Sequence, residues 1–264
     1  MYLVYLGESG NTGNSLNDPN QPHHVHVGLL VHESQSISIT GEFNALCRRH
    51  FGRPLGEPGT PTELRPADLY QGRGAFTSWP PARRNELIQD CLSIMIRRET
   101  PLIASYVNKQ ELAQARESGD GTDSLWQNPS QITMSKFLFA LNMFVDELNM
   151  TVMDSSQLME DSWPIANFAM VVAGDGRSVE PRFMTEFLKS SDGEDSTAVL
   201  GNFCFVGAEH SVGTQLANMC AYFARHWFQK PDDSHPYFDA LRDGKVVQVI
   251  YRVQLSLTPS LRQV

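Results

Sequence analysis

The sequence predicts an α/β fold, in which a single domain contains a mixed β-sheet with flanking helices. The chain of 264 residues opens with a short apolar run at residues 2–6, which is typical of a strand buried on both faces of a sheet. Helical periodicities and further short apolar runs then alternate along the chain, as they do in α/β domains. No linker is long enough to separate two domains, so residues 1–264 are expected to form one unit.

Two strands and two helices are predicted in the first hundred residues. A turn-rich segment follows the first strand and residues 24–31 predict a second strand, so the pair is expected to form a hairpin. Apolar residues at helical spacing predict a helix over residues 41–51, and the Gly- and Pro-rich segment 52–62 predicts a loop. Pro80 marks the start of a second helix, which continues to about Arg98.

Strands and helices continue to alternate in the rest of the chain. Strands are expected at residues 102–107, 165–173, 198–206 and 247–257, and helices at 134–148, 181–189 and 212–228. Residues 111–128 are expected to be part helix and part loop, and residues 154–164 are acidic and irregular. The last strand, within residues 245–258, is expected to join the edge of its own sheet; the alternative is pairing with a second copy to form a homodimer.

Charge and composition exclude several classes of protein. Lys and Arg number 21 against 30 Asp and Glu, and the net charge of -9 argues against a protein that coats nucleic acid through bulk charge. Many of the surplus acids lie in expected loops at 154–161 and 192–195, so the charge describes the surface. The net charge excludes neither a local basic face nor a metal site.

Localisation is expected to be cytoplasmic. The chain has no run of roughly 18 apolar residues that could span a membrane, and its start lacks the basic residues of a signal peptide. The four cysteines, Cys47, Cys91, Cys204 and Cys220, are far apart and lie among apolar neighbours. Reduced core thiols are therefore favoured over metal ligands or disulfides.

Polar residues next to predicted strands are the first candidates for chemistry. Glu8 and Ser9 follow the first strand, where a ligand could meet the sheet, although an ordinary glycine turn is the alternative. Glu63 and Asp68 precede a helix, where a solvated loop is the alternative. Asp175 ends a buried strand and could hold a metal or cap the next helix.

Gln215 and Asn218 are candidates on the last long helix. They lie three residues apart and therefore share one face. Asn218 interrupts an apolar sequence and needs a hydrogen-bond partner, which could belong to a ligand or to the fold.

Histidines and arginines give weaker signals. His24 and His26, with His32 farther on, share a strand face, but no Cys or acid accompanies them at a recognised metal spacing, so surface or edge-strand histidines are favoured. Most of the arginines are expected to be solvated, although together they could line a phosphate-binding face. These arginines are Arg48, Arg49, Arg53, Arg65, Arg73, Arg83, Arg84, Arg97 and Arg98.

The opening Tyr5-Leu6-Gly7-Glu8-Ser9-Gly10 resembles the "YxDESG" start of the bacterial family known as domain of unknown function 3800. Further similarities follow in that family's order: Glu63-Leu64-Arg65 with Asp68-Leu69 and Gly72-Arg73-Gly74-Ala75-Phe76, a strand ending in Lys109, Ala173-Gly174-Asp175, and Gln215-Leu216-Ala217-Asn218 with Ala221-Tyr222. The resemblance covers about residues 1–228.

This resemblance implies a ribonuclease H-like fold and a divalent-metal-dependent nuclease activity. In such chemistry carboxylates hold Mg²⁺ or Mn²⁺, which activates water and stabilises the leaving oxygen of a phosphodiester. The implied catalytic residues are Glu63, Asp175 and Asn218, with Glu63 and Asp175 as metal ligands. Glu8 is a further catalytic candidate, as a substitute for the acid that the family has at position 7. Substrate contacts are expected from Ser9, Arg65, Arg73, Lys109 and Gln215, and the expected partner is DNA or RNA.

The chain departs from the family pattern at two acidic positions. Gly7 stands where the family has its first-strand aspartate, and Asn218 stands where it has the aspartate of "QLAD". Glu8 is one residue along, so on a strand its side chain points to the opposite face. Two hypotheses follow: an impaired metal-dependent nuclease or phosphodiesterase, or a catalytically inactive pseudoenzyme that serves as a binding or assembly subunit. A third is an unrelated α/β enzyme that binds a small acidic or phosphorylated molecule in the same cleft at the strand ends.

Overall fold

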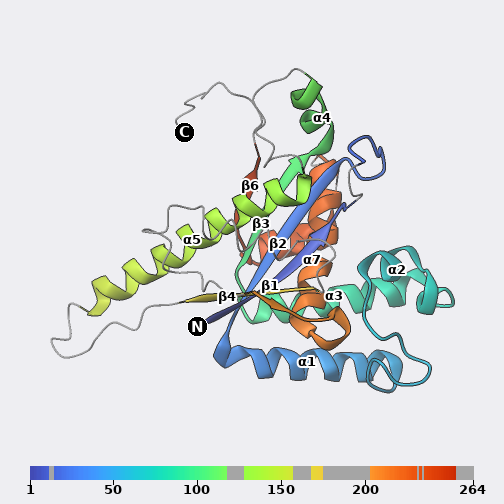
Figure 1. The fold of residues 1–264 in the computed structure, drawn as a ribbon. Coiled ribbons are helices and arrows are strands. Elements are labelled where there is room, and N and C mark those ends of the chain that lie inside the picture. The colour runs from blue at the N-terminus through green and yellow to red at the C-terminus, as the bar shows by residue number, and fades with distance from the viewer. Residues whose placement is uncertain are drawn as a thin grey trace.

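A six-stranded mixed sheet forms the centre of the molecule (Figure 1). The computed structural model describes residues 1–11, 15–117, 128–156, 168–174, 203–230, 232–233 and 235–253. The strands are β1 (Tyr2–Ser9), β2 (His23–His32), β3 (Leu102–Asn108), β4 (Ala169–Ala173), β5 (Cys204–Phe205) and β6 (Val247–Arg252), in the order β5-β4-β1-β2-β3-β6. β2 is antiparallel to both of its neighbours, whereas β1 with β4, β4 with β5 and β3 with β6 are parallel.

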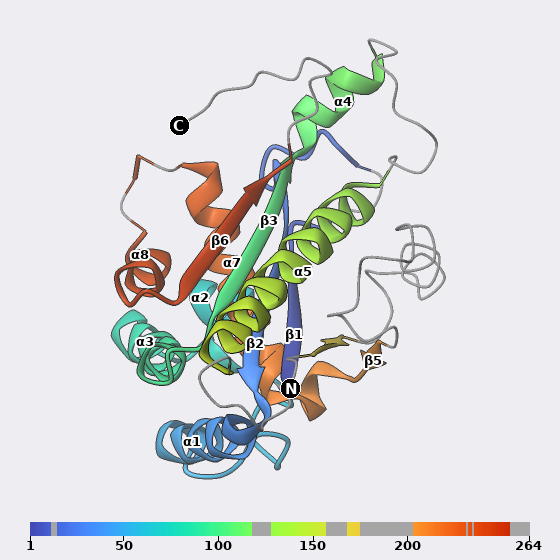
Figure 2. The same cartoon turned by 90° about the vertical axis from the view of Figure 1, so that its left-hand side faces the viewer.

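Helices cover both faces of this sheet. Those described are α1 (Glu33–Phe51), α2 (Pro66–Gln71), α3 (Pro81–Arg97), α4 (Lys109–Glu117), α5 (Pro129–Ser156), α7 (Val212–Gln229) and α8 (Pro236–Asp243), with short 3₁₀ turns η1 (Gly74–Phe76) and η3 (Ala208–His210). In Figure 2, α5 lies across one face of the sheet, and α7 lies behind the strands on the other. None of the helices described is long and apolar enough to cross a membrane.

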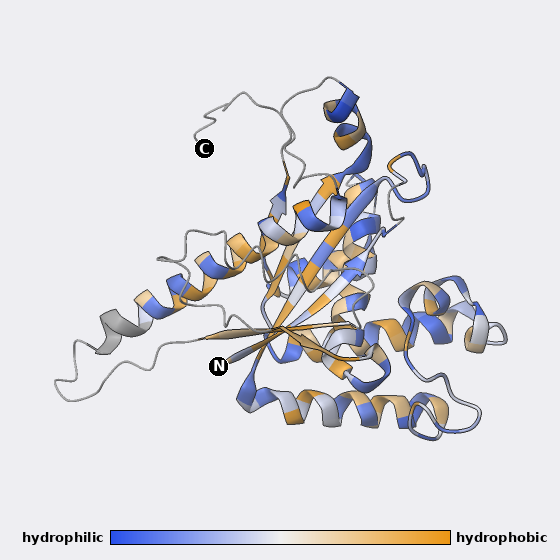
Figure 3. Ribbon diagram, in the orientation of Figure 1, coloured by the Kyte–Doolittle hydropathy of each residue, from blue (hydrophilic) through white to orange (hydrophobic). Residues whose placement is uncertain are grey.

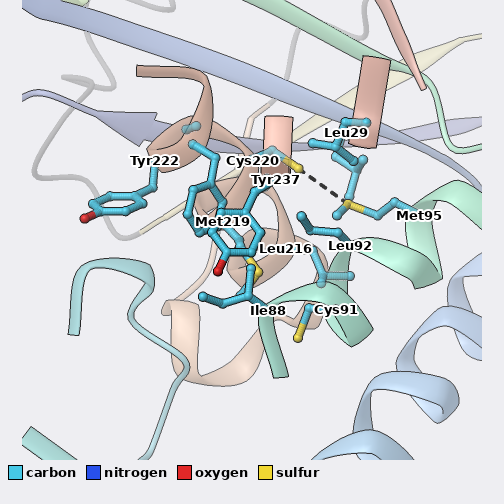
Figure 4. Close-up of a cluster of buried hydrophobic side chains, with 14 of the residues drawn as sticks. Leu29, Ile88, Cys91, Leu92, Met95, Leu216, Met219, Cys220, Tyr222 and Tyr237 are labelled. Carbon is cyan, nitrogen blue, oxygen red and sulfur yellow. Dashed lines mark hydrogen bonds between the residues drawn. The ribbon is translucent and has the colours of Figure 1, made fainter. Parts of the chain in front are cut away.

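The larger core lies between the sheet and helices α1, α3, α7 and α8. Figure 4 shows side chains of α3 and α7 packed together, among them Met95 and Cys220, whose sulfur atoms are 3.5 Å apart. Cys47, Cys91 and Cys220 are buried free thiols, as expected, and burial raises the pKa of Cys47 to about 12. Cys204 is also free but exposed, so it is not part of the core.

The second core lies under α5. Phe137, Leu138 and Leu141 of this helix pack against alternate side chains of the strands, including Val4, Leu6 and Leu30. The alternation of a strand therefore decides which residues meet α5 and which meet α7. Val4 and Leu6 face α5, so their next neighbour on that face is Glu8.

Most of the elements predicted from periodicity are present. The hairpin of β1 and β2, the helices α3, α5 and α7, and the strand β3 are confirmed. β6 pairs with β3 of its own sheet, which confirms the favoured alternative for the tail as far as Val253. A mixed sheet with flanking helices is likewise confirmed.

Several elements differ from the prediction. Helix α1 begins at Glu33 instead of residue 41, because the His32 side chain accepts a hydrogen bond from the backbone N–H of Ser34 and caps a polar first turn. Figure 3 shows the alternation of hydrophilic and hydrophobic residues along this helix. β4 begins at Ala169 and β5 at Cys204, and the predicted strand residues 165–167 and 198–202 lie outside the part of the chain that is described. The predicted helix at 181–189 and the residues 254–258 lie outside the part of the chain that is described.

Candidate functional site

A cleft of about 710 Å³ opens at the carboxyl end of β1. Its walls come from the end of β1, the segment around α2, and one face of α7. Its polar lining includes Ser9, Glu63, Arg65, Gln71, Arg73, Asn218, Tyr222, Arg225 and His226, and Glu8 also borders it. The fold therefore brings Glu63, Asn218, Ser9, Arg65 and Arg73 together, as the sequence resemblance implied.

Helix α7 lies unusually close to β1 beside this cleft. Gly213 of α7 faces the Tyr5 ring, and Gly7 of β1 faces the backbone of Ala217. A Cβ atom at position 7 would lie 2.2 Å from the carbonyl carbon of Ala217 and 2.5 Å from the backbone nitrogen of Asn218. Contacts below 3 Å are sterically forbidden, so position 7 has no room for a side chain of any kind.

Asn218 is held by the end of β1. Its Oδ1 atom accepts a hydrogen bond from the backbone N–H of Glu8 at 3.2 Å. This contact satisfies a strand-end donor and fixes α7 against β1. The partner that Asn218 requires is therefore supplied by the fold.

Both polar atoms of the Gln215 side-chain amide form hydrogen bonds within the fold. Its Oε1 accepts from the backbone N–H of Leu64 at 2.9 Å, and its Nε2 donates to the carbonyl of Ala208 at 2.9 Å. Gln215 is buried. It therefore ties the segment that carries Glu63 and the η3 turn to α7, although the sequence analysis expected a substrate contact.

The acidic groups near α2 are paired with arginines. Arg65 donates from Nε to Glu63 Oε1 at 2.6 Å, and this carboxylate raises the pKa of Arg65. Arg73 lies 3.1 Å from Asp68. Both guanidinium groups are more than half exposed, so each can still present N–H donors to a ligand in the cleft.

Arg225 is a cleft residue that the sequence analysis missed. It is buried, donates from Nε to Ser9 Oγ at 3.0 Å, and donates to the carbonyl of Asn20 at 3.2 Å. Burial lowers its pKa, but an arginine keeps its charge at neutral pH. The available signal was spacing: Gln215, Asn218, Tyr222 and Arg225 follow each other by three and four residues, which is one helix face.

His226 lies next to Arg225 in the same wall. Its Nε2 is 3.2 Å from an Arg225 terminal nitrogen, which can only donate, so the imidazole accepts. Burial and the Arg225 charge lower the pKa of His226 to about 4. The histidine is therefore neutral at physiological pH and adds no positive charge to the cleft.

Lys109 lies outside the cleft, although substrate contact was expected of it. The residue is fully buried at the start of α4, and its Nζ donates to the carbonyl of Gly10 at 3.0 Å. Burial lowers its pKa. The lysine supports the backbone that follows β1 and does not reach a ligand-accessible surface.

Glu8 points away from Asn218, to the α5 face, as the alternation of β1 predicted. Its Oε1 lies 2.7 Å from His24 Nε2.

His24 and His26 are 2% and 0% exposed, so the interpretation of these two as surface or edge-strand residues was wrong. The reason is that β2 is an inner strand, covered by β1 and β3 at its edges and by helices on both faces.

Asp175 lies outside the described residues. β4, which ends at Ala173, runs parallel to β1 and pairs with it. The proposed metal pair of Glu63 with Asp175 thus stays a prediction.

Comparisons with protein-family models, curated proteins and solved structures gave no match. The chemistry of the cleft therefore rests on its own side chains. Three guanidinium groups, from Arg65, Arg73 and Arg225, surround a polar floor with Asn218 and Ser9. Such a combination suits an anionic, phosphate-bearing ligand.

Proposed function

We propose that this chain is a ribonuclease H-like protein whose cleft binds a nucleic-acid strand through its phosphates without hydrolysing it. The observation that carries the proposal is the backbone contact between Gly7 and Ala217. The resemblance requires a carboxylate at position 7, and this contact excludes any side chain there. An inactive binding protein accounts for that contact better than an impaired nuclease does.

The fold is compatible with this proposal. A mixed sheet in which β2 alone among the described strands runs against the others, with helices on both faces, agrees with a ribonuclease H-like architecture. The cleft lies at the carboxyl end of the central strand β1, where ligands of α/β proteins commonly bind.

The donors in the cleft do not fit a pair of Mg²⁺ or Mn²⁺ ions, as far as the described residues go. Both ions prefer several carboxylate oxygens. Glu63 is already paired with Arg65, the Asn218 oxygen accepts from Glu8 N–H, and the Glu8 side chain lies on the other face of the sheet.

Binding is tested with labelled single-stranded DNA and RNA oligonucleotides by fluorescence anisotropy. Arg73→Ala removes an exposed guanidinium from the cleft, whereas Arg48→Ala removes one from an exposed position on α1 as the matched control. We expect Arg73→Ala alone to weaken binding and to reduce the slope of log affinity against log salt by about 0.7, the value for one contact to a single strand. Equal effects of the two variants, or no binding by the parent, would refute the proposal.

Cleavage is tested on the same oligonucleotides with Mg²⁺ and Mn²⁺. We expect negligible cleavage. Robust cleavage by the unaltered chain that Asp175→Ala abolishes would replace the binding-only function with the metal-dependent nuclease.

A further inference from the structure

We propose that Glu8, His24 and His26 form a binding site for a zinc-type divalent cation between the sheet and α5. Glu8 is directly opposite His26 in the β1–β2 register, and His24 is two residues from His26, so all three side chains lie on the same face. One ligand atom from each residue lies within 4.8 Å of the other two. The site lies behind the sheet from the cleft wall that Asn218 and Arg225 form, and it does not depend on the proposed function.

Thr133 of α5 orients both imidazoles. Its Oγ1 lies 3.0 Å from His24 Nδ1 and 2.7 Å from His26 Nδ1. A hydroxyl has only one proton, and the carbonyl of Pro129 at 2.9 Å accepts it. The hydroxyl then accepts from both rings, which assigns a proton to each Nδ1 and leaves a lone pair on each Nε2.

This tautomer assignment leaves both Nε2 atoms as electron-pair donors. His24 Nε2 faces Glu8 Oε1 at 2.7 Å, so two acceptors meet unless a proton or a cation lies between them. His26 Nε2 is buried and has no hydrogen-bond partner among the described residues. A buried nitrogen without a partner carries a desolvation cost, which a bound cation would remove.

The donor set selects the class of cation. Two imidazoles and one carboxylate form the protein ligand set of many zinc sites with an open fourth position, whereas Mg²⁺ prefers oxygen ligands only. Metal-bound histidines usually donate their second ring N–H to a fixed acceptor, and Thr133 supplies it here. Tetrahedral zinc ligands lie about 3.3 Å apart, so modest side-chain rotations bring the three atoms to the required distances.

The site also has an entry path. Glu8 is 13% exposed at its side chain, whereas both histidines are buried behind it. An ion can therefore reach Glu8 first and then bind the two imidazoles. A fourth ligand can be water that reaches the partly exposed carboxylate of Glu8.

A second group of possible ligands, His50, Glu86 and Asp90, lies between α1 and α3. It is a weaker candidate because Asp90 is already paired with both Arg49 and His50, and Glu86 is exposed. Asp90→Asn therefore serves as the matched control, since it removes a carboxylate ligand from that group alone.

The experiment titrates ZnCl₂ into tag-free, chelator-treated protein by calorimetry and records the visible spectrum with Co²⁺. We expect one equivalent of Zn²⁺ to bind the parent, a raised melting temperature, and Co²⁺ absorption bands of a four- or five-coordinate ion. Glu8→Gln and His26→Gln should each weaken Zn²⁺ binding at least tenfold and remove the Co²⁺ bands. Asp90→Asn should change neither.

Circular dichroism reports whether each variant folds. Glu8→Gln keeps the shape of a partly exposed side chain and is therefore expected to fold. It tests the site even if His26→Gln does not fold. The proposal is overturned if the parent binds no stoichiometric Zn²⁺. It is also overturned if binding persists in Glu8→Gln or is lost in Asp90→Asn.

Discussion

Gly7 and Asn218 differ in what their backbone surroundings permit. At Asn218 an amide oxygen accepts the Glu8 N–H, and a carboxylate oxygen of similar shape could accept it too. At Gly7 the Ala217 backbone occupies the space that a Cβ atom needs. Asn218 therefore differs from an aspartate by one functional group, whereas the absence of a side chain at Gly7 is built into the packing of α7 on β1.

Gly7→Ala is expected to lower the free energy of unfolding by about 3 kcal/mol, because overpacking against a backbone cannot be relieved by a side-chain rotation. Gly41→Ala in α1 is the control: its Cβ meets no atom within 4 Å, and the change should raise stability by about 0.5–1 kcal/mol. Urea denaturation measures both. Equal stabilities of the two variants would show that α7 does not lie against β1 as described.

Helix α7 carries the polar wall of the cleft on an otherwise apolar element. Its small residues Gly213 and Ala217 allow close approach to β1, and the polar stripe from Gln215 to Arg225 lies beside them. Each polar residue of the stripe holds a different part of the chain: Gln215 the segment at Leu64, Asn218 the end of β1, and Arg225 the loop at Asn20. The helix thus assembles the cleft from distant segments.

Gln215→Met tests this assembling role. The substitution keeps the length of the side chain but leaves the buried Leu64 N–H without its partner and removes one of two hydrogen bonds to the Ala208 carbonyl, so the free energy of unfolding should fall by about 1–3 kcal/mol. Gln89→Met, on an exposed position of α3, should change it by less than about 0.5 kcal/mol. Denaturant unfolding compares the two. A harmless Gln215→Met would assign the residue to ligand contact instead of to the fold.

At the scale of the whole molecule, β6 protects one edge of the sheet. It pairs with β3 from Leu102 to Tyr106, and Val253 beyond it is buried. Without it, β3 would present unpaired N–H and C=O groups, which promote association between chains. The homodimer stays a prediction. Among the strands described, only β3 pairs with β6, so the other edge of β6 could pair with a second copy of the chain.

A chain that ends at Val246 is expected to be less stable and to associate in a concentration-dependent way, because β3 becomes an edge strand. A chain that ends at Val253 keeps β6 and is the control. Light scattering after size-exclusion chromatography measures association, and thermal unfolding measures stability. A shorter chain that stays monomeric and as stable as its control would contradict a structural role for β6.

Residue spacing along the sequence predicted the helices and strands better than it predicted which residues line the cleft. α3, α5 and α7 follow from apolar spacing, but the first turns of α1 were missed because they are polar and Ile37 is 87% exposed. Glu63, Ser9, Arg65, Arg73 and Asn218 were expected near one another and line one cleft. Arg225 was missed and Lys109 was expected to reach a ligand, because burial depends on which distant segments cover a side chain.

The sequence by itself determined the strands, most helices, the hairpin of β1 and β2 and the face of Glu8, because periodicity and strand alternation are local properties of the chain. Only the tertiary structure decided what those faces meet. The contact of Gly7 with Ala217 and the hydrogen bond from Glu8 to Asn218 join residues about two hundred positions apart, and the histidines of β2 meet Thr133 of α5. Such contacts depend on strand order and helix placement, which are set by packing of the whole core.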